Sequence, residues 1–254
     1  MDLKELYPIH GQSIWLDYIR RHLLTSGELK RMVEQDGLRG VTSNPSIFQK
    51  AIAGSTDYEE TISRFESEQD RTAGELYEHL AVEDIQAAAD VLRTVYDESD
   101  RKDGFVSMEV SPYLAHDTEA TLNEARRLWK TVGRENLMVK VPATPEGIPA
   151  IRQLIGEGIN VNVTLLFARA AYAKVLEAYM DGLETFAKQG GELKRVASVA
   201  SFFVSRIDTA VDALLEVETS SADKDARSKL VGKIAIASAK LAYQDWQATC
   251  KSAR

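Results

Sequence analysis

The chain has 254 residues, of which 44% are hydrophobic and 28% charged, and it can therefore bury one large core or two small ones. Its formal net charge of -8, with acidic and basic residues mixed along the chain, gives no broad attraction to nucleic acid or to anionic membranes. No apolar run approaches the roughly 20 residues needed to cross a bilayer, and the first residues lack the form of an export signal. We therefore expect a single cytoplasmic domain over residues 1–254, with no nucleic-acid or membrane partner.

Cysteine and histidine usage argues against a metal centre. Cys250 is the single cysteine, and the four histidines lie far apart in the sequence. A zinc site needs three or four such ligands, usually at short spacings, and a disulfide needs a second cysteine. The sequence predicts neither a metal nor any other cofactor.

Six short apolar segments predict β-strands, and each precedes a helical pattern. They lie at residues 13–17, 40–42, 105–110, 137–141, 159–167 and 196–204. After the first, Thr25-Ser-Gly-Glu28 has the spacing of a capping box, and Gly37 is placed to end the helix that follows. Residues from about 56 to 99 and from about 208 to 250 predict helices without a strand, the second interrupted near 219–223. Strands that alternate with helices predict a parallel sheet.

Each predicted strand carries polar residues at or near its carboxyl end. These residues are Asp17, Thr42 to Asn44, Glu109, Lys140, Asn162 with Thr164, and Ser201. In a (β/α)₈ barrel the catalytic groups converge on that face from many strands. A doubly wound sheet is the alternative, but no glycine-rich phosphate turn follows the first strand. We expect an α/β fold of the (β/α)₈ barrel type, with about six of the eight strands encoded in this chain.

One lysine stands inside the apolar segment LMVKVP at residues 137–142. Strand alternation points Lys140 away from the face that Val139 and Val141 share. A strand lysine is more often a solvated edge residue. In a parallel strand covered on both faces, however, burial favours the neutral amine, which can attack a carbonyl and form a Schiff base. The local pattern alone leaves both interpretations open.

Five motifs, in order, resemble the successive signatures of transaldolase: GVTSNPSIF, VSMEVSP, VKVPATPEGIPAIRQL, NVNVTLLF and ASVASFFVSRID. The resemblance runs from Ser13 to about Tyr243. It implies a barrel enzyme of the pentose phosphate pathway that moves a dihydroxyacetone unit from a ketose phosphate to an aldose phosphate through a lysine Schiff base. The implied partners are sugar phosphates, namely fructose 6-phosphate, sedoheptulose 7-phosphate, erythrose 4-phosphate and glyceraldehyde 3-phosphate.

The resemblance assigns four catalytic roles. Lys140 falls on the Schiff-base lysine, and Asp17 on the carboxylate that takes the hydroxyl proton when the carbon–carbon bond breaks. Glu109 matches the acid/base that works through a water, and Thr164 matches the hydroxyl that positions that water. Without the resemblance, Asp17 would be read as a helix cap, Glu109 as a structural partner of Lys140, and Thr164 as an ordinary strand residue.

The resemblance also assigns substrate-binding residues. Its sugar pocket corresponds to Thr42, Asn44, Asn162 and Ser201, whose short polar groups suit hydroxyl recognition. Otherwise, the TSNP segment would indicate only a turn.

Arg206 matches a phosphate-binding arginine, although a lone arginine would more often pair with an acid such as Asp208. Phe203 lies beside it as hydrophobic packing. In the wider family a tyrosine at this place accompanies simple aldolase activity, so Phe203 favours transfer over cleavage.

Family members usually continue beyond the segment GKIAIASAKLAY into two further strands and a second phosphate contact. We therefore expect a C-terminally incomplete barrel that is completed by self-association, by a complementary C-terminal chain, or by a rearrangement of helices over the opening. Two other functions stay open: an aldolase of the fructose-6-phosphate type, which uses the same lysine, and an inactive barrel fragment that associates with another chain or with itself.

Overall fold

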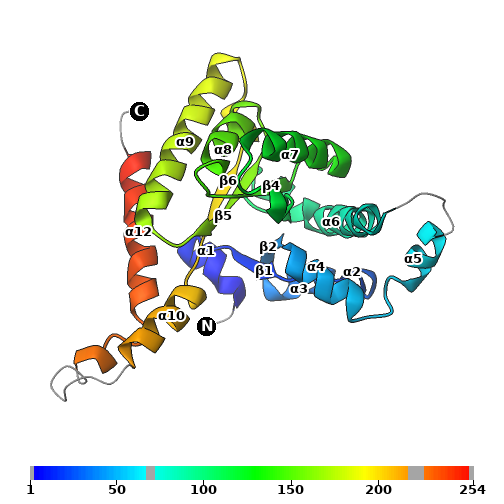
Figure 1. Cartoon of the computed structure of the whole chain (residues 1–254), viewed down its shortest axis with the longest axis horizontal. Coiled ribbons are helices and arrows are strands. Elements are labelled where there is room, and N and C mark those ends of the chain that lie inside the picture. The colour runs from blue at the N-terminus through cyan, green and yellow to red at the C-terminus, as the bar shows by residue number, and fades with distance from the viewer. Residues whose placement is uncertain (1–2, 67–71, 217–225, 252–254) are drawn as a thin grey trace.

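A computed structural model describes residues 3–66, 72–216 and 226–251 of the chain (Figure 1). Its strands are β1 (Ile14–Asp17), β2 (Leu38–Thr42), β3 (Phe105–Glu109), β4 (Leu137–Pro142), β5 (Val161–Leu166) and β6 (Ser198–Phe202). Its α-helices are α1 (Leu6–His10), α2 (Arg21–Thr25), α3 (Glu28–Asp36), α4 (Pro45–Ala53), α5 (Glu59–Glu66), α6 (Ala73–Glu98), α7 (Thr118–Val132), α8 (Gly147–Gly156), α9 (Arg169–Lys188), α10 (Ser205–Leu215) and α12 (Ile234–Cys250). Short 3₁₀ turns are η1 (Leu3–Glu5), η2 (Pro112–Leu114) and η3 (Leu193–Arg195).

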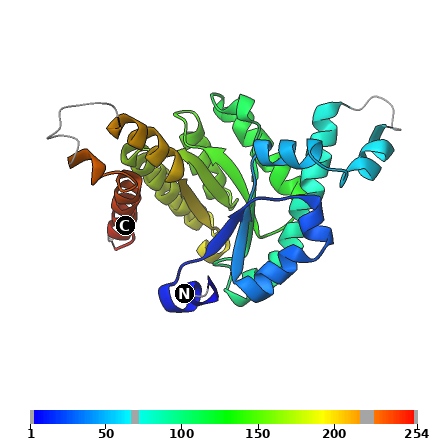
Figure 2. The same cartoon turned by 90° about the horizontal axis from the view of Figure 1, so that it is seen from below.

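The six strands form one parallel sheet in the order β1-β2-β3-β4-β5-β6. Strands that follow one another in the chain are therefore neighbours in the sheet, as in a (β/α)₈ barrel. Figure 2 shows the sheet curling into a half-barrel with helices around its outer face. Across the described ranges, β1 pairs only with β2 and β6 only with β5. The predicted barrel type is confirmed for six strands, with two open edges.

The predicted strands are all present, with ends that lie within about two residues of the expected ones. The long helical stretches are also confirmed, by α5 with α6 and by α10 with α12, whereas the predicted interruption at 219–223 lies outside the described residues. Gly37 ends α3 in the left-handed conformation, with a φ of 75°.

The predicted capping box at Thr25 is wrong. Thr25 instead ends α2, and Gly27, with a φ of 79°, is the N-cap of α3. The glycine can adopt this left-handed conformation, so the chain turns sharply between two short helices. The Glu28 backbone N–H is then satisfied by Ser26 Oγ, at 3.3 Å.

The two faces of the sheet are filled differently. Val139, Val141, Val161 and Val163 point outward into the main core beneath the helices. The inner face has its own floor, in which Trp15 packs with the cluster of Tyr96, Phe105 and Met138. Gly40 makes this floor possible, because a Cβ there would lie 2.4 Å from two carbons of the Trp15 indole. The polar residues at the strand ends therefore stand above an apolar layer.

The last helices extend the layer around the sheet. Figure 1 shows α12 running beside α9, and Arg169 on α9 holds Asp245 on α12 through two hydrogen bonds of 2.8 and 2.7 Å. Among the helices of the described ranges, none combines the length and the apolar character required to cross a membrane.

Candidate active site

Lys140 lies inside the barrel on β4, a strand flanked by β3 and β5, and is only 7% exposed. Its Nζ donates to the backbone carbonyl of Ser43 at 3.1 Å and lies 3.6 Å from Glu109 Oε2. The interpretation of Lys140 as a solvated edge residue is therefore wrong. A buried amine held by one carbonyl and one carboxylate is suited to nucleophilic chemistry on a carbonyl substrate.

Glu109 ends β3 and pairs in register with Lys140 on β4. Burial raises the pKa of Glu109, and this effect outweighs the lowering by the charge of Lys140. The charge of Asp17 also raises the pKa of Glu109, so the two carboxylates interact across the barrel. Glu109 therefore keeps its proton to a higher pH than an ordinary glutamate and can act as a proton donor beside the lysine.

Asp17 and Thr42 pair in register at the carboxyl ends of β1 and β2. Asp17 is exposed at the carboxyl end of β1. Thr42 Oγ1 is buried and has no hydrogen-bond partner among the described residues. A buried unpaired hydroxyl beside a carboxylate is a natural partner for a hydroxyl-bearing ligand.

Asn162 pairs in register with Lys140 and is held at both ends of its amide. Its Nδ2 donates to Ser107 Oγ at 2.9 Å, and its Oδ1 accepts from Ser201 Oγ at 2.7 Å. The predicted residues Asn162 and Ser201 are thus brought together, in contact with each other. The rigid amide presents a fixed polar surface next to the lysine.

Thr164 lies at a bulge in β5. The register pairs Val163 with Ala200 but Leu166 with Phe202, so one extra residue stands on β5. Leu165 takes up the irregularity in the left-handed region, with a φ of 59°. Thr164, 3% exposed, therefore keeps the inner face while Leu166 packs into the outer core.

Asn44 has the capping role that its turn motif indicates. It is the N-cap of α4, where its Oδ1 accepts from the Ile47 backbone N–H at 3.0 Å and Pro45 opens the helix. This bond uses the amide oxygen, so the amide nitrogen can still donate to a ligand.

Phe203 and Arg206 form a layered group at the rim beyond β6. The Phe203 ring stacks on Phe167, with centroids 4.5 Å apart and planes within 3° of each other, and the Arg206 guanidinium lies 4.7 Å over the Phe203 ring. Asp208, the alternative partner of Arg206, accepts instead from the Ala235 backbone N–H at 3.1 Å. The arrangement holds the guanidinium by its flat face and leaves its edges for an anion.

Two residues of this region, Ser107 and Phe167, escape the sequence patterns, and Ser43 is noted there only as one of the polar residues that follow its strand. Ser43 and Ser107 are fully buried, and each lies inside a motif beside a predicted site residue. Ser43 directly follows Thr42 and Ser107 lies two residues before Glu109, and this closeness was the available signal for their roles, because a serine in a strand or turn has no distinctive spacing.

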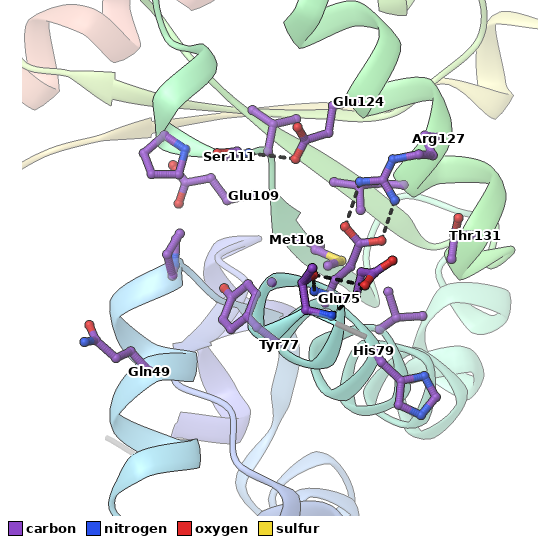
Figure 3. Close-up of a pocket in the computed structure, with 18 of the residues that line it drawn as sticks. Gln49, Glu75, Tyr77, His79, Met108, Glu109, Ser111, Glu124, Arg127 and Thr131 are labelled. Carbon is purple, nitrogen blue, oxygen red and sulfur yellow. Dashed lines mark hydrogen bonds and ion pairs between the residues drawn. The ribbon is translucent and has the colours of Figure 1, made fainter. Parts of the chain in front are cut away.

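A hollow of about 1090 Å³ lies on the helix side of β3, between α4, α5, α6 and α7. Met108 and Glu109 line it together with Tyr77 of α6, and Arg127 closes one side through its ion pair with Glu78 (Figure 3). Burial, with the charges of Glu109 and Glu78, raises the pKa of Tyr77 to about 12. The hollow therefore reaches Glu109 from the helix side of β3, and the neutral phenol of Tyr77 lines the same space.

The family profile described as Transaldolase/Fructose-6-phosphate aldolase matches residues 14–253. The chain belongs to this transaldolase family. It is 47% identical over 248 residues to the "Transaldolase" of Trichodesmium erythraeum (strain IMS101) and 49% identical over 254 residues to the "Transaldolase 2" of Nostoc punctiforme (strain ATCC 29133 / PCC 73102). Each of these matches covers 96% of this chain and 65% of the relative. The transaldolase resemblance of the motifs is confirmed, and the chain spans just under two thirds of the length of these relatives.

Proposed function

We propose that this chain carries the Schiff-base site of a transaldolase, with Lys140 as the nucleophile. The observation that carries the proposal is the buried Nζ of Lys140, 3.6 Å from Glu109, on a barrel face that also holds Asn162 and Thr164. The family membership supports the same reaction.

The proposed reaction moves a three-carbon unit between sugars. The neutral Lys140 amine adds to the ketone carbon of a ketose phosphate, and the ketone oxygen leaves as water with a proton supplied through Glu109. Asp17 takes the proton of the hydroxyl on the second carbon from the iminium carbon while the bond between the first and second carbons breaks, which releases the second carbon as the aldehyde of an aldose phosphate and leaves an enamine on Lys140. The enamine attacks an acceptor aldehyde, Asp17 returns the proton, and water releases the new ketose.

Substrate identity rests on the family and on the rim residues. We infer donors such as fructose 6-phosphate and sedoheptulose 7-phosphate, and acceptors such as erythrose 4-phosphate and glyceraldehyde 3-phosphate, within the pentose phosphate pathway. Arg206 would bind the phosphate, with Thr42, Asn44, Asn162 and Ser201 on the sugar hydroxyls. A cytoplasmic location stays a prediction from the sequence.

A simple fructose-6-phosphate aldolase is the second candidate, because the family description includes it. Phe203 argues for transfer: its ring stacks on Phe167 and carries no hydroxyl that could donate a proton to the enamine on Lys140. Coupled assays separate the two, since a transaldolase turns over fructose 6-phosphate only when an acceptor is supplied. Equal release of glyceraldehyde 3-phosphate with and without erythrose 4-phosphate would favour the aldolase.

The direct test is reductive trapping. Incubation with fructose 6-phosphate and borohydride should add one three-carbon unit to the chain, and peptide mapping should place it on Lys140. Lys140→Ala should gain no label, whereas Lys174→Ala, which removes an exposed lysine on α9, should label like the parent chain. Label on another lysine with Lys140 untouched would reject the assignment.

A further inference from the structure

The Lys140 nitrogen is held by two groups that behave differently during a reaction. Glu109, at 3.6 Å, must gain and lose a proton if it serves as the acid/base. The Ser43 carbonyl, at 3.1 Å, is a backbone acceptor that does not titrate. Of these two contacts, the hydrogen bond to the Ser43 carbonyl can therefore persist through every step.

The direction of this carbonyl is set by the Ser43 side chain. Ser43 directly follows β2 and is fully buried, and its Oγ donates to the backbone carbonyl of Ser107 on β3 at 2.7 Å. This bond extends the pairing of β2 with β3 beyond its last matched residues, Thr42 and Ser107. On the other side, Asn44 caps α4. The backbone at Ser43 is thus fixed from both directions.

Ser107, whose backbone carbonyl accepts this bond, also takes part through its hydroxyl in a chain of side-chain hydrogen bonds. Ser107 Oγ accepts from Asn162, and Asn162 accepts from Ser201, so with the Ser43 bond these contacts link the end of β2 to β3, β5 and β6. Ser43 and Ser107 are fully buried and Asn162 is 1% exposed. In such a dry setting, losing one bond leaves a polar group unsatisfied and loosens its neighbours.

We propose that Ser43 is a positioning residue of the Schiff-base reaction, whose hydroxyl, clamped to Ser107, aims the Ser43 carbonyl at the Lys140 nitrogen. When the amine adds to a ketone and water leaves with the ketone oxygen, the iminium nitrogen keeps one hydrogen. That hydrogen donates to the Ser43 carbonyl, which fixes the plane of the iminium and the side of the three-carbon chain that faces Asp17. This inference rests on the proposed function of Lys140.

The test uses dihydroxyacetone, a three-carbon ketone without phosphate, and borohydride trapping measured by intact mass. In Ser43→Ala, which loses the clamp, the trapping rate at saturating dihydroxyacetone should fall about fivefold to tenfold, as expected for one hydrogen bond. The half-saturating concentration should change by less than about twofold, because no binding group is removed.

Ser43→Cys should be equally slow, since a thiol is a weak donor, and Ser43→Thr, which keeps the hydroxyl, should recover most of the rate. Ser46→Ala, an exposed serine in the first turn of α4, is the matched control.

Thermal unfolding of each variant separates loss of positioning from loss of fold. A slow rate counts only in a variant that still unfolds cooperatively above the assay temperature, and Ser43→Cys carries the test if Ser43→Ala does not fold. Parent-like rates in the alanine or cysteine variant, or a threonine variant as slow as alanine, would overturn the inference and leave Lys140 as the nucleophile. A parent chain that gains no three-carbon unit on Lys140 would instead remove the proposed function, and this inference with it.

Discussion

Burial of Glu109 gives the site a pH dependence. Its pKa is raised in the folded chain chiefly by burial, so the folded state binds this proton more tightly than the unfolded state does. The corresponding stability is fully present below the unfolded pKa and is lost as the pH rises through the folded pKa. The charged carboxylate therefore costs stability at neutral pH.

We predict that Glu109→Gln changes the pH dependence of unfolding. The unfolding free energy of the variant minus that of the parent chain should rise from about pH 4 to about pH 8, because glutamine has no proton to release. Denaturant titrations at several pH values measure the difference. Glu177→Gln, at an exposed position on α9, is the control and should show a flat difference. A Glu109→Gln difference that is flat or falls with pH would contradict the raised pKa.

The stack of Phe167, Phe203 and Arg206 predicts a selective effect on phosphate-bearing substrates. Phe167→Ala removes the ring against which Phe203 rests and should weaken apparent affinity for fructose 6-phosphate about threefold to tenfold, the range of an aromatic pair. Trapping of dihydroxyacetone, which has no phosphate, should not change. Phe167→Tyr retains the ring and is the matched control. A parallel loss with both sugars would show that the stack supports the whole site rather than Arg206.

At the level of single residues, the sequence identifies most of the candidate site but not the residues that hold it in place. Lys140, Glu109 and Asn162 lie within recognisable motifs, and strand alternation alone turns Lys140 from its valine neighbours. The role of Ser43 depends on a carbonyl direction, and that of Phe167 on a contact with Phe203, which follows another strand. Neither quantity has a spacing that a linear pattern can report.

Among the elements, β5 combines regular pairing with one strained residue. Leu165 has a φ of 59°, a conformation that costs a residue with a Cβ about 1–2 kcal/mol. Its side chain is 42% exposed, so it gains little by burial. The bulge is maintained because it lets Thr164 and Leu166 occupy opposite faces of the sheet.

We predict opposite effects of glycine at two neighbouring strand positions. Leu165→Gly should be more stable than Leu165→Ala by about 1 kcal/mol, because glycine adopts a positive φ without strain. Ala200→Gly, at an exposed residue of β6 paired to Val163, should instead lose about 0.5–1 kcal/mol. Denaturant midpoints of the variants provide the comparison. If glycine is also the less stable residue at 165, the bulge does not store strain there.

The positions of strands and helices can be predicted from the sequence because buried apolar residues recur at a regular spacing along each element. The six strands are apolar runs of ordinary length, and the helices carry apolar stripes. The details of helix ends are less predictable: the TSGE segment meets the spacing of a capping box, but Gly27 in the left-handed conformation separates α2 from α3 instead. Here the geometry needed to pack two short helices overrides the local motif.

For the whole molecule, the open edges of the half-barrel matter most. In the described part of the chain, β1 and β6 each have one strand neighbour, and unpaired strand edges favour pairing with another chain. The sequence predicts six strands but not how their edges are satisfied, since pairing partners can come from outside the chain.

We predict that the chain self-associates or binds a complementary chain through these edges. Size-exclusion chromatography with light scattering should give a mass above 28.2 kDa that rises with concentration, and a lysine placed on the edge strand β6 at Ala200 should reduce it. The same lysine on the exposed face of α9, at Ala173, is the control. A compact monomer with full transaldolase turnover would refute the prediction.

The contact between Lys140 and the Ser43 carbonyl has a consequence for mutational surveys of this protein. An alanine scan deletes side chains and leaves every peptide group in place, so no codon change removes this acceptor. A survey of that kind would score position 43 by its hydroxyl alone and would miss the atom that touches the lysine. Only a change to the main chain itself, such as an ester in place of the peptide bond that carries this carbonyl, would weaken the acceptor directly.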